Sequence, residues 1–161
     1  MSSIKFVNHA SVIINDEKIS LLSDPWYSGT AFHDGWSLIY ENKEDDIKNI
    51  LNNITHIWIS HEHPDHFSVP FFKKYASCLK EKKIKILFQE TKDKRIVKFI
   101  SSMGIEIKEL INKKEYILSE KFKIKCVKSN FYDSALIIKI GDKTIFNLND
   151  CPIHEIKEIK N

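Results

Sequence analysis

The chain has 161 residues, of which 42% are hydrophobic and 29% are charged, as in a typical globular domain. Its 25 Lys and Arg residues nearly balance its 22 Asp and Glu residues, so the net charge of +3 argues against nucleic-acid and anionic-membrane partners. No apolar run reaches membrane-spanning length, and the N-terminus lacks the apolar stretch of a signal peptide. The three widely spaced cysteines do not suggest a disulfide framework, which favours a cytoplasmic protein.

The first part of the chain predicts strands followed by a helix. Strands are expected at 11–14 and 19–22, on either side of a polar hairpin turn. A long loop rich in aromatic residues then covers about 23–40, and a short helix is expected at 45–51. Residues 56–60 follow as a short buried strand.

The second part alternates helices and strands before becoming all β. A helix at 69–77 is expected to begin after Ser68 as its N-cap, and a second helix at 91–103 is expected to stop at Gly104. Further strands are predicted at the following ranges: 84–88, 116–118, 121–127, 134–140 and 144–148. This order predicts a single α/β domain over residues 1–161, with helices outside a sheet-rich core.

The segment His61-Glu62-His63-Pro64-Asp65-His66 carries the strongest chemical signal. Residues i and i+2 at an extended strand end face the same side, so His61 and His63 can meet at one point. After a bend at Pro64, Asp65 and His66 can face a second point. Imidazole and carboxylate ligands suit zinc, iron or manganese better than calcium. Composition alone would produce such a cluster in about one chain in a thousand.

This segment resembles the His-x-His-x-Asp-His signature of the metallo-β-lactamase superfamily. Asn8-His9-Ala10-Ser11 and Asp24-Pro25-Trp26-x-x-Gly29-x-x-Phe32-x-x-Gly35-Trp36 are similar to its branch of nucleotide-sugar hydroxylases, which act on CMP-N-acetylneuraminate and UDP-N-acetylmuramate. Asn149-Asp150-Cys151 resembles the same branch. The resemblance covers about residues 8–151 and implies a metallo-β-lactamase-like αββα sandwich, with an expected incomplete C-terminal end.

The resemblance also implies ligand roles. His61 and His63 would bind one metal ion, Asp65 and His66 would bind a second, and Asp150 would bridge the two. One or two zinc ions are the expected cofactor, with iron as the alternative. Two dications about 4 Å apart need anionic groups between them, which agrees with these aspartates. The alternative role for Asp150 is that of a turn or cap residue.

Two departures from the superfamily pattern stand out. The superfamily usually supplies a third histidine just before the strand predicted at 134–140, and none occurs there. Ser129 or Asn130 falls nearest that position, which predicts a weak or absent first site, and Asp133 is an alternative oxygen donor. The superfamily fold also normally continues further, so we expect a truncated or split domain, with His154 as a possible substitute ligand.

The aromatic loop suggests where a small-molecule substrate binds. His9, Trp26, Phe32 and Trp36 are candidates to contact a sugar or nucleotide sugar, because aromatic rings beside polar groups suit such ligands. The alternative is that they form a satellite core under the loop.

Three functions agree with these features. The first is a metal-dependent hydrolase that uses a metal-activated water, with Asp65 and Asp150 as catalytic residues. The second is the metal-binding domain of a nucleotide-sugar hydroxylase. Cys151 and His154 have the spacing of half a Rieske cluster, but the other half is absent, so an electron-transfer or complementing partner chain would be needed. The third is an inactive or binding-only relative.

Overall fold

The larger sheet contains six strands in the spatial order β1-β2-β3-β6-β7-β8. The computed structural model describes residues 2–129 and 132–152. The strands of this sheet are β1 (Ser3–Asn8), β2 (Ser11–Asn15), β3 (Ser20–Ser23), β6 (His56–Ile59), β7 (Lys85–Gln89) and β8 (Ile107–Leu110). The first three pair antiparallel, whereas β3, β6, β7 and β8 run parallel to their neighbours.

Parallel neighbours need crossover connections, and three helices lie in these connections. They are α1 (Glu44–Asn53), α2 (Val69–Glu81) and α3 (Arg95–Ser102). In α1, Ile47, Ile50 and Leu51 are buried at the i, i+3, i+4 spacing of a core-facing helix. All three helices bury apolar residues in one cluster with side chains from the larger sheet, so they cover one face of it.

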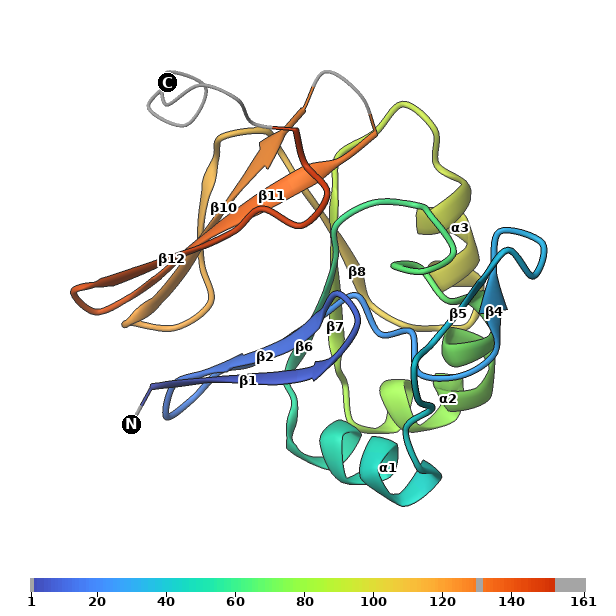
Figure 1. Ribbon diagram of the computed structural model, residues 1–161. Coiled ribbons are helices and arrows are strands. Elements are labelled where there is room, and N and C mark those ends of the chain that lie inside the picture. The colour runs from blue at the N-terminus through green and yellow to red at the C-terminus, as the bar shows by residue number, and fades with distance from the viewer. Residues whose placement is uncertain (1, 130–131, 153–161) are drawn as a thin grey trace.

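A second sheet has the order β12-β11-β10-β9 and is antiparallel throughout. Its strands are β9 (Glu115–Ile117), β10 (Phe122–Lys128), β11 (Ser134–Ile140) and β12 (Lys143–Asn147). Leu21, Trp58 and Leu87 of the larger sheet form one buried cluster with Phe122 and Leu136 of the second. The two sheets therefore pack face to face, and Figure 1 shows the helices on one side of them.

The observed layers confirm the predicted α/β sandwich class. The described residues supply a helix layer and two sheets, and within 2–129 and 132–152 no helix covers the outer face of the second sheet. Two very short strands, β4 (Thr30–Ala31) and β5 (Trp36–Ser37), pair within the aromatic loop. No helix in the described part of the chain is long and apolar enough to span a membrane.

Most predicted elements are confirmed within a few residues, and α3 shows the main error. The sequence predicts its start at Thr91, but the helix begins at Arg95. The Asp93 carboxylate accepts a hydrogen bond from the Arg95 backbone N–H at 2.9 Å, and the Thr91 hydroxyl donates to the Asp93 carbonyl at 2.5 Å. These local bonds compete with helical ones and keep residues 91–94 in a loop. Strands β1 and β8 were not predicted as separate elements.

Candidate metal centre

The histidine motif leaves the larger sheet at the carboxyl end of β6. This strand stops at Ile59, and the following residues form bends and a turn in which the His63 carbonyl accepts hydrogen bonds from the N–H groups of His66 and Phe67. β6 thus ends before His61, and the chain bends from Glu62 onward. The rings of His61 and His63 meet as predicted, because Nε2 of His61 lies 2.8 Å from Nδ1 of His63.

Seven side chains from four separate places in the chain converge here. They form three overlapping groups, and within each group one potential ligand atom per residue lies within 4.8 Å of the others. The groups are His61, His63 and Asp133; His9, Asp65 and His66; and His61, His66 and Asp150. The third group shares one member with each of the other two, so it lies between them.

The distances between these atoms suit a shared metal ion. Two ligand atoms that each lie about 2.1 Å from one ion are about 3.0–3.4 Å apart at octahedral to tetrahedral angles. Nε2 of His66 lies 3.3 Å from Oδ2 of Asp65 and 3.3 Å from Oδ2 of Asp150. Nε2 of His61 lies 3.5 Å from Oδ1 of Asp133.

Two buried polar atoms at this place have no hydrogen-bond partner within the described residues. They are Oδ1 of Asp65 and Nε2 of His66. The carboxylates of Asp65 and Asp150 lie within ion-pair distance of Nε2 of His66, but they are not oriented to form a hydrogen bond with it. Because buried polar atoms are almost always satisfied, these two point to a missing partner. A cation between imidazole and carboxylate would supply one, so the residues present fit a metal ion.

Asp24 fixes the orientation of His66 from behind. Its fully buried carboxylate accepts hydrogen bonds from the backbone N–H and the hydroxyl of Ser60, both at 2.8 Å, and from the side-chain amide of Asn149. Oδ2 of Asp24 also lies 3.1 Å from Nδ1 of His66. This contact occupies one ring nitrogen and turns the other toward Asp65 and Asp150, as carboxylates do behind histidine ligands of metals.

The same contacts set the charge of the buried groups. Burial opposes protonation of His66, but its contacts with the carboxylates of Asp24 and Asp65 outweigh burial and raise its pKa to about 10. Burial would raise the pKa of Asp65, yet the contacts with His66 and His9 hold it at about 2. The pKa of His61 is lowered, first by burial and then by the charge on His66. A metal ion at His66 must displace its proton, so metal binding weakens as pH falls.

The four aromatic candidates divide into two kinds. The ring of His9 lies 5.1 Å from that of Trp26 and 6.4 Å from that of Trp36, and its Nε2 lies 3.1 Å from Oδ2 of Asp65. Trp26 is only 2% exposed, so it packs beneath His9 and does not line an open surface. Phe32 and Trp36 are 39% and 55% exposed, and the ring of Phe32 lies 5.7 Å from that of His63.

Several residues of this centre were not given a role from the sequence. The sequence pointed to Asp24 only as part of a motif, and to Ser60 only as the last residue of the strand predicted at 56–60. A polar residue directly after a buried strand was the available signal in both cases. Asp133, named only as an alternative, lies against His61, whereas Asn130 and His154 lie outside the described residues.

A family model described as the beta-lactamase superfamily domain matches residues 3–149. The chain belongs to this superfamily. It is 36% identical over 73 residues to the inactive cytidine monophosphate-N-acetylneuraminic acid hydroxylase of Homo sapiens, a match that covers 45% of this chain and 14% of the human protein. It is 43% identical over 56 residues to the hydroxylase of Sus scrofa, which covers 35% of this chain and 13% of that protein. The match thus spans about one seventh of the human relative's length.

Solved structures show the same superfamily fold. CmlA, a diiron beta-hydroxylase from Streptomyces venezuelae, aligns with a TM-score of 0.69 at 14% identity, over 92% of this chain and 29% of that chain. A possible metal-dependent hydrolase from Veillonella parvula aligns with a TM-score of 0.68 at 14% identity, over 99% of this chain and 64% of that chain. At such low identity these likenesses support the fold and not a shared reaction.

Proposed function

We propose that this superfamily domain binds two metal ions and catalyses hydrolysis of a small molecule. The observation that carries the proposal is the convergence of imidazole and carboxylate atoms at distances of 2.8–3.5 Å, with two buried atoms that lack hydrogen-bond partners within the described residues. His61 and His63 would hold one ion, Asp65 and His66 would hold the other, and Asp150 would bridge them. Zinc is the first candidate and iron the second.

The chain's own groups provide what hydrolysis needs. When bound, such ions lower the pKa of a coordinated water to about 7 and polarise the substrate oxygen. Asp65 and Asp150 would accept and hold a proton at carboxylate oxygens beside Nε2 of His66. His9 fixes the Asp65 carboxylate through its 3.1 Å contact, and Asp24 fixes His66. These positioned groups favour hydrolysis as the reaction.

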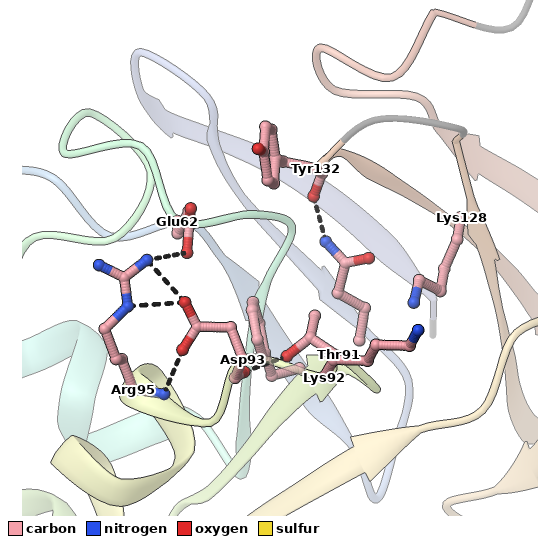
Figure 2. A pocket seen from close by; sticks show the side chains of 9 residues that line it. Glu62, Thr91, Lys92, Asp93, Arg95, Lys128 and Tyr132 are labelled. Carbon is pink, nitrogen blue, oxygen red and sulfur yellow. Dashed lines mark hydrogen bonds and ion pairs between the residues drawn. The ribbon is translucent and has the colours of Figure 1, made fainter.

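A pocket of about 390 Å³ lies beside the motif and favours an anionic substrate (Figure 2). Glu62, between the two first histidines, lines one wall of it. Arg95 pairs with Asp93 at 2.6 Å and with Glu62 at 3.8 Å, so its positive charge offsets one of the two negative charges on that side. Figure 2 shows Lys92 and Lys128 on the side away from Arg95. Their ammonium groups would attract a phosphate or carboxylate group, such as the phosphate of a nucleotide sugar.

The aromatic loop would contact the uncharged part of the same substrate. Phe32 and Trp36 are exposed next to His63 and His9, where flat rings can pack against a sugar. His9 would lie at the border between substrate and carboxylate. Trp26 would act only by supporting His9 from below.

A second candidate function is supported by the relatives named as hydroxylases. The chain could be the metal-binding part of a nucleotide-sugar hydroxylase, with iron in place of zinc and electrons from a partner chain. The match to the cytidine monophosphate-N-acetylneuraminic acid hydroxylases and the aromatic loop favour it. A third candidate, a binding-only relative, follows from the absence of the usual third histidine from the sequence.

Metal analysis of protein purified without chelators tests the proposal. We expect close to two equivalents of metal per chain in the wild type and almost none in the double variant His63→Ala, His66→Ala. Circular dichroism should show a retained fold. The matched control is His33→Ala, an exposed histidine outside the three ligand groups, which should keep full metal content. A double variant with wild-type metal content contradicts the site assignment.

The same preparation separates the three functions. Zinc or manganese together with metal-dependent cleavage of a phosphodiester or lactone supports hydrolysis. Iron together with turnover that requires a ferredoxin-like donor supports the hydroxylase function. A folded wild type that takes up no metal supports the binding-only relative and overturns the main proposal.

A further inference from the structure

The side chain of Asp133 comes from the second sheet and meets the first two histidines of the motif. Asp133 stands directly before β11, and its Oδ1 lies 3.5 Å from Nε2 of His61. Potential ligand atoms of His61, His63 and Asp133 all lie within 4.8 Å of one another. The Asp133 side chain is only 17% exposed. A carboxylate thus lies at the place where the sequence lacks a histidine.

The backbone around Asp133 is held from both sides. Its carbonyl accepts a hydrogen bond from the Ser129 backbone N–H at 3.0 Å, which closes the loop between β10 and β11. The next residue, the fully buried Ser134, donates from its hydroxyl to the Ser60 carbonyl at 2.6 Å. Because Ser60 directly precedes His61, this bond links the two chain segments that carry the carboxylate and the imidazole. The approach of Asp133 to His61 is therefore built into the packing of the sheets.

The charge of Asp133 has no basic partner within the described residues. Its ion-pair contact is with His61, and neither a lysine nor an arginine of residues 2–129 and 132–152 pairs with it. A largely buried carboxylate is normally paired or bound to a metal ion. Two imidazoles and one carboxylate around a single point, with open positions left over, are a ligand set that catalytic zinc sites and non-haem iron(II) sites both use.

We propose that Asp133 replaces the third histidine as a ligand of the ion held by His61 and His63. The inference rests on the proposed metal-binding function and specifies the ligands of one of its two ions. It is compatible with either hydrolysis or hydroxylation.

Three variants test the role of Asp133. Asp133→Asn keeps the shape and removes the charge, Asp133→His introduces the imidazole that the sequence lacks, and Asp142→Asn is a control at an exposed turn. Each metal-free protein is incubated with zinc, or without oxygen with iron(II), then passed through a desalting column and analysed for the metal added. Circular dichroism of each variant checks folding.

We expect Asp133→Asn to lose about one equivalent of metal and to bind either metal at that position at least about tenfold more weakly in a chelator competition. Asp133→His should recover the lost equivalent, and Asp142→Asn should match the wild type. Unchanged metal content in Asp133→Asn would overturn the role of Asp133 while leaving the proposed metal centre intact. A wild type without metal would overturn both proposals.

Discussion

At the residue scale, the centre depends on groups that do not themselves reach the proposed ions. Asp24 and Ser60 hold His66 and His61 in place, since the Ser60 hydroxyl oxygen lies 2.8 Å from Oδ2 of Asp24 and 2.9 Å from Nδ1 of His61. The residue types and spacing of the histidine motif predicted that its side chains converge, because the histidines lie within a few residues of one another in the chain. They could not predict Asp133 or the role of Asp24, whose contacts depend on strands 36 or more residues away in the chain.

Replacement of Asp24 by asparagine should weaken metal binding without removing any proposed ligand. The amide keeps the shape but cannot provide the negative charge that orients His66, and loss of such a supporting carboxylate costs about 10–100-fold in metal affinity. A chelator competition titration measures this, with Asp45→Asn on the exposed start of α1 as control. Equal affinities for Asp24→Asn and the wild type would contradict the positioning role.

At the element scale, periodicity predicted the helices and the buried strands well because each covers one face of a core. The predicted strand at 134–140 matches β11 to the residue. The edge strand β1 was missed because Ile4 and Phe6 are more than half exposed, so its apolar residues do not report on burial. β8 was missed because its sequence, Ile-Lys-Glu-Leu at Ile107–Leu110, places two charged residues side by side and so does not alternate between apolar and polar residues.

The start of α2 offers a direct test of such local signals. The Ser68 side chain accepts a hydrogen bond from the Phe71 backbone N–H at 3.3 Å and is buried. Ser68→Ala should lower the free energy of unfolding by about 1 kcal/mol, because an N–H of the first turn then loses its partner. Urea denaturation measures this change. Ser77→Ala inside the same helix should cost nothing, since alanine favours helix, and equal stability of the two variants would contradict the cap.

At the scale of the whole molecule, one core joins both sheets. Trp58 and Leu87 from the larger sheet and Leu136 from the second lie in the same buried cluster. The sequence predicted a layered α/β arrangement from the order of elements, but strand neighbours and sheet facing depend on contacts distant in the chain. The predicted single domain over residues 1–161 stays a prediction.

Truncation of Leu136 tests whether the two sheets unfold together. Leu136→Ala leaves a cavity between them and should cost about 2–5 kcal/mol, whereas Lys139→Ala on the exposed face of the same strand should change stability by less than about 0.5 kcal/mol. Tryptophan fluorescence and far-ultraviolet circular dichroism should shift to lower urea together. Separate transitions for the two signals would show that the sheets are independent units.

The backbone at the centre has a consequence for protein engineering. His9, Asp24 and Asn149 all have positive φ angles, of 45°, 36° and 52°, a conformation that costs a side-chain-bearing residue about 1 kcal/mol or more. Glycine would relieve this cost at His9, whereas at Asp24 it would also leave the buried N–H and hydroxyl of Ser60 without their acceptor. Selection for heat resistance alone would therefore favour loss of His9, and with it the contact that fixes the Asp65 carboxylate.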